Sequence, residues 1–95
     1  MAFAPLDPVL HNQLRLAITS LLVAVEGADF NFLLEKTGAT RGNLSVQISK
    51  LKEAGYVRVE KTFKDNYPNT ACSLTPQGLA AFEHYVKAIK EYVGK

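Results

Sequence analysis

The chain has 95 residues, of which 47% are hydrophobic and 21% are charged, close to the proportions of an ordinary globular domain. Its single cysteine, Cys72, excludes an internal disulfide and fits a reducing compartment. No apolar run approaches the ~20 residues of a transmembrane helix, and the N-terminus lacks the regions of a signal peptide. We therefore expect one cytoplasmic domain, residues 1–95, that does not enter a membrane.

The net charge of +2 is unevenly distributed along the chain. Residues 1–39 carry two basic and four acidic side chains, residues 40–64 carry six basic and two acidic ones, and residues 65–95 carry three of each. A polyanion would be drawn to the middle segment by Coulomb attraction and counterion release. An ordinary solvated face with scattered lysines explains the charge alone equally well.

The first predicted helix covers about residues 8–25, with Asp7 as its N-cap and Pro8 in its first turn. The apolar residues of this helix extend over more than one amphipathic stripe, so other elements should cover the helix on two sides. A short second helix is expected between Asp29 and Gly38, a residue type that commonly ends helices. The turn that follows has the length found in a helix-turn-helix.

The third predicted helix begins after its cap, Thr40, and ends at Gly55. Leu44, Ile48 and Leu51 repeat at helical spacing and define its buried stripe. The opposite side carries small and polar side chains, which would let the backbone approach the floor of a DNA groove. Arginine can bind guanine, asparagine adenine, and an apolar side chain the thymine methyl group. The DNA-contacting candidates on this helix are Thr40, Arg41, Gly42, Asn43, Ser45, Val46, Ser49 and Lys50.

Two strands are expected next. Val57 and Val59 alternate with charged residues, as in a half-buried strand. Lys61 follows where a core residue is expected, so either the strand has left the core or Lys61 faces something negative. The turn-rich segment 65–69 predicts the tip of the hairpin. The predicted fold is mainly α with a small β-wing, a winged helix-turn-helix with a three-helix core, a two-stranded wing and a long C-terminal helix.

The last helix is predicted from Pro76 to about Val93 and carries two apolar rows. One row could pack on the first helix, and the other needs a further partner. We therefore predict a homodimer formed by helices about 8–25 and 76–93. The alternative is one wide face buried within a single domain. The candidate interface residues are Leu10, Leu14, Ala81, Tyr85, Ala88 and Tyr92.

Three segments carry a resemblance to a known family: residues 40–45 (TRGNLS), residues 51–57 (LKEAGYV) and residues 74–78 (LTPQG). Together they resemble the small winged-helix transcriptional regulators of the MarR/ArsR-like group, over roughly Arg15 to Phe82. The resemblance implies a dimeric, sequence-specific DNA-binding protein, with dimer contacts from the first and last helices. It also implies that the third helix reads the major groove and that the wing contacts the backbone or minor groove.

One departure concerns the wing, because related wings often carry arginines around a proline near the tip and segment 65–69 has none. Lys61 and Lys64, at the base of the wing, are therefore the candidates for phosphate contacts. We predict a regulator, a repressor, that binds double-stranded DNA at a palindromic operator. The alternative is a winged helix that binds another protein and no DNA. An unidentified small-molecule effector could lie between the first and last helices.

Other chemistry is expected to be absent. Cys72 shares a face with Leu74, so it should pack inside as an inert hydrophobe rather than sense redox state. His11 and His84 have no second ligand at helical spacing, so we expect no metal. The sequence shows no nucleophile–base pair, phosphate loop or cofactor fingerprint, so we expect neither a cofactor nor enzymatic activity.

Overall fold

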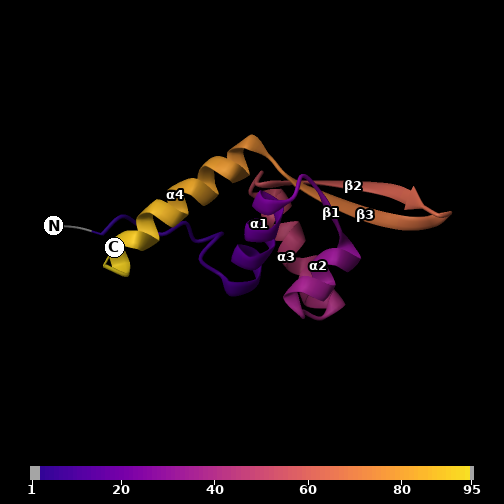
Figure 1. The fold of residues 1–95 in the computed structure, drawn as a ribbon, viewed down its shortest axis with the longest axis horizontal. Coiled ribbons are helices and arrows are strands. Elements are labelled where there is room, and N and C mark those ends of the chain that lie inside the picture. The colour runs from indigo at the N-terminus through magenta and orange to yellow at the C-terminus, as the bar shows by residue number, and fades with distance from the viewer. Residues whose placement is uncertain (1–2, 95) are drawn as a thin grey trace.

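The computed structural model describes residues 3–94 and contains four helices and a three-stranded antiparallel sheet (Figure 1). The predicted mainly α fold with a small β-wing is confirmed. Within the described residues, no helix is long and apolar enough to span a membrane. In chain order the elements are α1 (Gln13–Ala24), β1 (Ala28–Asp29), α2 (Phe30–Thr37), α3 (Arg41–Glu53), β2 (Val57–Lys64), β3 (Tyr67–Leu74) and α4 (Pro76–Tyr92).

The first helix begins later than predicted, at Gln13. The Asp7 carboxylate accepts from the backbone N–H groups of Val9, at 2.8 Å, and Leu10, at 3.4 Å, and so closes a separate turn. Asn12 then caps α1 by accepting from the backbone N–H of Arg15 at 2.9 Å. An asparagine side chain that bonds to the backbone in this way favours a cap over a helix interior, which is why the chain is not one helix from Pro8 onward.

The sheet contains one strand more than predicted, and its order is β1-β3-β2. β1 pairs through Ala28 with Cys72 and through Asp29 with Ala71, too short a strand to leave a periodic pattern. The hairpin turn is also tighter than the predicted tip, because only Asp65 and Asn66 lie between β2 and β3, both with positive φ. Residues 67–69 belong to β3, where Pro68 pairs only with β2 and so needs no second hydrogen-bonded neighbour.

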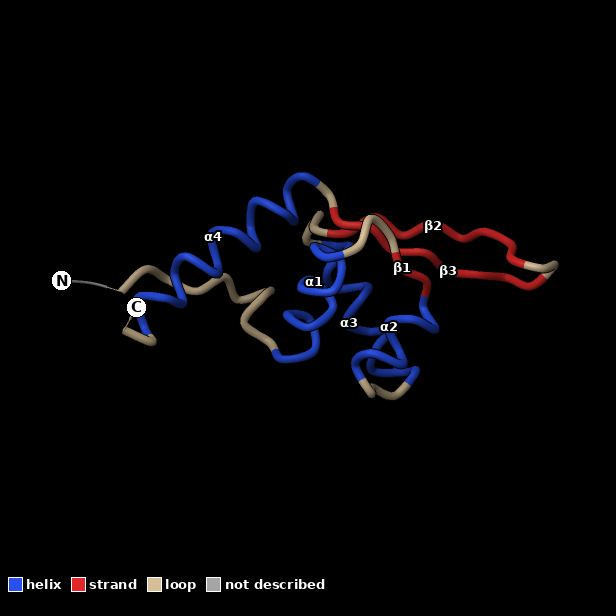
Figure 2. The backbone as a smooth tube through the Cα atoms, in the orientation of Figure 1, coloured by secondary structure: helices blue, strands red, loops and turns tan. Residues whose placement is uncertain are grey.

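The core lies where α1 meets α2, α3 and the base of the sheet (Figure 2). Ile18 of α1, Leu33 of α2 and Leu44 and Leu51 of α3 are fully buried there, and Cys72 of β3 is 1% exposed. The short elements therefore share one core. α3 packs on this core through its buried face and leaves the opposite face exposed.

α4 projects from this core together with the N-terminal arm, residues 3–12, while the wing projects at the other end (Figure 1). The chain spans 56 × 25 × 21 Å and has a radius of gyration of 14.2 Å, against about 12 Å expected for a compact chain of this length. The Tyr92 ring stacks on Phe3 at a centroid distance of 4.7 Å, and its hydroxyl donates to the Ala4 carbonyl at 2.7 Å. The arm therefore covers one side of α4.

The first turn of α4 packs directly on the turn between α3 and β2. The Thr75 hydroxyl donates to the Gly55 carbonyl at 2.6 Å, and the Thr75 backbone N–H donates to the Tyr56 carbonyl at 3.0 Å. Gly78 is buried against the same carbonyl, and a Cβ added there would lie 2.1 Å from the Tyr56 oxygen. Only a glycine permits this approach of helix to turn.

Substituting Gly78→Ala should lower the free energy of unfolding by about 1–3 kcal/mol or more, because the methyl group overlaps backbone that cannot move aside. Denaturant unfolding measures the loss. Gly42→Ala is the matched control, since a Cβ at Gly42 meets no atom within 4 Å and alanine should stabilise that helix by roughly 0.5–1 kcal/mol. Equal stabilities for wild type and Gly78→Ala would show that the contact can relax.

The arm is tied to the same turn by Tyr56, whose hydroxyl donates to the Asp7 carboxylate. This hydrogen bond, with burial and the carboxylate charge, raises the pKa of Tyr56 to about 12. An unfolded tyrosine ionises near pH ~10, so the stabilisation is complete below pH ~10 and is lost as pH rises toward ~12. We expect Tyr56→Phe to be less stable than wild type below pH ~10, with the difference shrinking above it. Chemical unfolding of wild type and Tyr56→Phe across that pH range measures the two free energies of unfolding. A difference between them that does not change with pH would contradict the account.

Candidate nucleic-acid interface

α3 buries one side and exposes the other. Leu44 and Leu51 are fully buried and Ile48 is 6% exposed, which confirms the predicted stripe. Val46, on the opposite side, is 50% exposed. Thr40 caps the helix by accepting from the backbone N–H of Asn43 at 3.2 Å. The structure places all eight candidates in and beside α3 on the exposed surface: Thr40, Arg41, Gly42, Asn43, Ser45, Val46, Ser49 and Lys50.

The exposed side of α3 has two flanks with different neighbours. On the α1 flank, Gln47 accepts a hydrogen bond from Arg15 and donates one to Asn43 at 3.0 Å. On the wing flank, Ser45 and Lys52 line a hollow of about 220 Å³ that also reaches the base of the wing. Small polar side chains therefore lie at the centre of a surface bounded by α1 on one side and the wing on the other.

The hollow beside the wing is basic. Lys52 of α3 and Lys61 of β2 both line it and both are exposed. Its other lining residues are Phe30, Ser45, Ile48, Ser49, Val59 and Thr70, so no carboxylate lines it. Two ammonium groups in one concave surface attract an anion such as a phosphate. The sequence predicted Lys61 here but not Lys52, because Lys52 is brought to the site only by the way the hairpin folds back beside α3.

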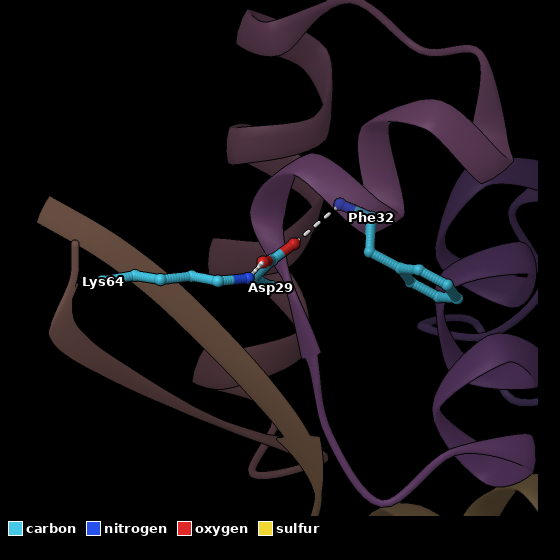
Figure 3. Close-up of polar contacts among 3 residues, drawn as sticks. All are labelled: Asp29, Phe32 and Lys64. Atoms are coloured by element: carbon cyan, nitrogen blue, oxygen red, sulfur yellow. Dashed lines mark hydrogen bonds and ion pairs between the residues drawn. The ribbon is translucent and has the colours of Figure 1, made fainter. Parts of the chain in front are cut away.

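The two lysines predicted for phosphate contact lie on opposite faces of the wing. Lys61 pairs with Thr70 and shares its face with Val57 and Val59, since alternate residues of a strand point the same way. Its exposure shows that the strand has left the core by that point. Lys64 falls on the other face, where its ammonium lies 3.6 Å from the Asp29 carboxylate (Figure 3).

Asp29 has two partners, one in the helix-turn-helix and one in the wing (Figure 3). Its carboxylate accepts from the backbone N–H of Phe32 at 2.8 Å, which caps α2, and it also pairs with Lys64. The Lys64 side chain is 69% exposed and that of Asp29 is 22% exposed, so the ion pair contributes little to stability. A phosphate could therefore compete with Asp29 for Lys64 at small cost.

The wing tip carries two exposed aromatic side chains that were not among the predicted site residues. Phe63 is 78% exposed and Tyr67 is 74% exposed. Phe63 follows Lys61 by two residues and so lies on the same face of β2. This alternation is visible in the sequence and is the signal that could have identified Phe63.

Arg41 lies back across α2 at the edge of the exposed surface. Its guanidinium carbon is 5.8 Å from the centroid of the Phe30 ring, and its Nη2 is 3.5 Å from Asn31 Oδ1. A guanidinium stacked on an aromatic face keeps its N–H groups available at its edge. Arg41 thus lies at the rim of the surface rather than at its centre.

The predicted dimer residues do not form one free surface. Leu10 is 0%, Tyr85 5% and Ala88 3% exposed within the chain itself, so in this conformation they cannot reach a partner. Leu14 and Ala81 pack partly against the core, and Tyr92 is 45% exposed beside the arm. The arm, of which only residues 8–12 were expected to be helical, runs along this row of α4 and contacts Tyr85 and Tyr92. The assignment of these residues to a dimer interface stays a prediction.

The apolar row of α4 that faces solvent contains Leu79, Val86 and Val93 rather than the predicted interface residues. Leu79 is 40% and Val93 71% exposed, and Val86 is half-buried. These three residues are each seven apart, so they form a single stripe along the helix. Phe82 and Ile89, which lie between these residues at helical spacing, are partly buried and pack against the core.

Of the other reactive side chains, Cys72 is buried, His11 is close to a tyrosine hydroxyl, and His84 is exposed. Cys72 is buried, as predicted, and desolvation raises the pKa of its thiol, which opposes formation of a reactive thiolate. His11 Nδ1 lies 3.0 Å from the Tyr85 hydroxyl. Over residues 3–94, no three His, Cys, Asp or Glu side chains gather in a way that could hold a metal ion.

The chain is similar to known DNA-binding domains. Residues 14–93 match the model of a family described as the winged helix DNA-binding domain. An uncharacterised protein of Methanocaldococcus jannaschii is 33% identical over 81 residues, which cover 85% of this chain and 88% of that protein. A transcriptional regulator homologue from Pyrococcus horikoshii has a similar structure, with a TM-score of 0.84 and 27% identity over 90% of this chain and 85% of that one.

A further similar structure is that of a longer chain. The transcriptional regulator BldR of Sulfolobus solfataricus superposes with a TM-score of 0.74 and 20% identity, over 86% of this chain and 58% of that chain. At that identity the likeness concerns the fold alone. The predicted resemblance to small winged helix-turn-helix regulators is confirmed by these matches together.

The two roles of Asp29 can be separated by substitution. Asp29→Ala removes the cap and the ion pair and should cost about 0.5–2 kcal/mol, whereas Asp29→Asn keeps a capping oxygen and should cost at most about 0.5 kcal/mol. Thermal unfolding at low and high salt gives both values. If Asp29→Asn greatly lowers the stability at low salt but not at high salt, the ion pair rather than the cap is the main contribution of Asp29 to stability.

Proposed function

The chain belongs to the winged helix DNA-binding domain family, and on that premise we propose that it is a cytoplasmic, sequence-specific transcriptional regulator that binds a palindromic operator as a homodimer. The observation that carries this proposal is the exposed side of α3, where small and polar side chains surround Val46 and basic groups border them. Seated across a promoter, such a dimer excludes other proteins from the DNA, so we propose that it acts as a repressor.

In this account α3 enters the major groove, whose width of about 12 Å admits a helix. Gly42, Val46 and Ser49 lie at the centre of the exposed side, where short side chains allow close approach to the base edges. Asn43 and Ser45 flank them and contact bases. Thr40, Arg41 and Lys50 lie at the rim and contact phosphates. Lys52 and Lys61, in the hollow between α3 and the wing, hold the backbone beside the groove.

A second copy is proposed to bind the outward stripe of α4. Leu79, Val86 and Val93 form an apolar line on a helix that projects from the core, and burial of apolar surface against a twofold-related helix stabilises a dimer. The twofold axis would set two α3 helices about 34 Å apart, one turn of DNA, and would account for a palindromic operator.

The proposed place for a small-molecule effector is a pocket of about 410 Å³ between the end of α1 and the start of α4. Leu22, Val25, Leu74 and Leu79 are among its apolar lining residues. The pocket adjoins the proposed dimer stripe through Leu79, so a ligand bound there would alter the angle between the two copies.

Selection of bound sequences from a random DNA pool tests the proposal. We expect enrichment of a twofold-symmetric sequence, and size measurement by light scattering should show two chains per particle. Failure to bind any duplex at low salt, together with capture of a stoichiometric protein partner, would instead favour a winged helix that binds protein.

Lys61→Ala should weaken binding to all sequences alike and reduce the slope of log affinity against log salt by about one for each lysine lost. The reason is that a phosphate contact releases a counterion and carries no sequence information. Filter binding or fluorescence anisotropy at two salt concentrations measures the slope. Lys87→Ala, an exposed lysine of α4, is the matched control and should leave the slope unchanged; equal effects of the two variants would contradict the placement of DNA at the hollow.

A further inference from the structure

We propose that Gln47, itself held by Arg15, fixes the side-chain amide of Asn43 with its N–H groups toward the DNA, and that this orientation sets the base preference of α3. The inference rests on the proposed function and assigns a positioning role to two residues that the account so far has not placed at the DNA. It concerns a single connected set of hydrogen bonds that begins in the N-terminal arm and ends on the exposed side of α3.

The set begins at the guanidinium of Arg15. Its Nε donates to the Val9 carbonyl, and its Nη2 lies 3.4 Å from the Pro8 carbonyl. Its Nη1 donates to Gln47 Oε1 across the boundary between α1 and α3. Gln47 Nε2 then donates to Asn43 Oδ1, one turn earlier in α3, at 3.0 Å. Arg15 and Gln47 are both half-buried, while Asn43 is exposed.

The direction of every bond in this set follows from the arginine. A guanidinium has only donors and stays protonated, whereas an amide has an oxygen that accepts and a nitrogen that donates. Gln47 must therefore turn its oxygen toward Arg15, which leaves its nitrogen toward Asn43. Asn43 must in turn present its oxygen to Gln47, so its Nδ2 is the group left to face outward.

The orientation is held firmly because Arg15 is bound at three sites. Two carbonyls of the arm and the Gln47 oxygen engage the guanidinium from different sides. Rotation of the Gln47 amide would place its N–H groups against those of the guanidinium, which leaves donors facing donors. Asn43 cannot turn over without the same conflict at Gln47, so the half-buried Arg15 guanidinium determines the orientation of the exposed Asn43 amide.

This orientation changes what Asn43 can read. An unrestrained asparagine binds adenine through both its oxygen and its nitrogen, as the sequence suggested for Asn43. With its oxygen turned toward Gln47 and one of that oxygen's lone pairs engaged there, Asn43 presents its two N–H donors to the groove. In the major groove guanine presents two acceptors, N7 and O6, whereas cytosine presents a donor, the N4 amine. We therefore expect Asn43 to select guanine at its position.

The variant Gln47→Glu tests the direction of the set. A glutamate still accepts from Arg15 but cannot donate to Asn43, so the Asn43 amide should turn over to donate to the carboxylate. Its oxygen would then face the DNA, where it accepts from an exocyclic amine. Selection from a random pool should show the preference at that position change from guanine toward cytosine or adenine, with a change of about fivefold or more in relative affinity.

Three further variants make the result specific. Asn43→Ala identifies the position that Asn43 reads, because preference there should disappear. Arg15→Met removes the group that sets the direction, so preference there should become weaker without reversing. Gln77→Glu makes the same substitution at an exposed residue of α4 outside the set, and should leave the base preference unchanged. Thermal unfolding of each variant confirms that it is folded before selection.

The outcomes separate this inference from the proposed function. If wild type enriches no sequence, the proposed function fails. If wild type enriches a sequence but Gln47→Glu keeps the wild-type preference at the position that Asn43→Ala identifies, the inference is overturned while the proposed function stands. The inference is also overturned if Asn43→Ala changes no position.

Discussion

The close approach of α4 to the turn between α3 and β2 is the contact on which the rest of the structure depends. Gly78 lies against the Tyr56 carbonyl where no side chain fits, and Thr75 bonds to both residues of the turn. Tyr56 in turn holds Asp7 of the arm. The end of α3, the start of the wing, α4 and the arm are therefore joined within a few residues.

This arrangement explains how a small core can hold the exposed side of α3 in a fixed orientation. α1 contributes fully buried Ile18 and Thr19 to the interior, and its exposed end contributes Arg15, which binds both the arm and α3. α3 is consequently fixed by apolar contacts below and by a hydrogen-bonded side chain at its flank. A helix held on two sides can present its remaining side chains in a defined geometry, which base recognition requires.

The sequence predicted the elements whose signals are local. The cap at Thr40 is found where expected, Asp29 and Thr75 cap α2 and α4 at the predicted starts of those helices, and the buried stripe of α3 follows from its spacing. The start of α1 was wrong because Asn12 offers a cap that competes with continuation of the helix from Pro8. β1 could not be predicted, since two residues carry no period and are defined only by their pairing with Cys72 and Ala71.

The candidate site was less predictable because its parts are joined by tertiary contacts. Exposure of the α3 residues follows from helical geometry, but the place of Lys52 beside Lys61 depends on the path of the hairpin. The attachment of Lys64 to Asp29 likewise depends on β1 joining the sheet. Which row of α4 is free could not be read from its apolar pattern, because both rows repeat at the same spacing and only the path of the arm distinguishes them.

The central claim is that the exposed side of α3 and the adjoining hollow contact DNA. Backbone amide chemical shifts, recorded by NMR while a short duplex is added at low salt, test it most directly. The account predicts shifts concentrated between Arg41 and Lys52 and at Lys61, with the outward stripe of α4 little changed. Shifts confined to α4 and the arm, or none at any ratio of DNA to protein, would contradict it.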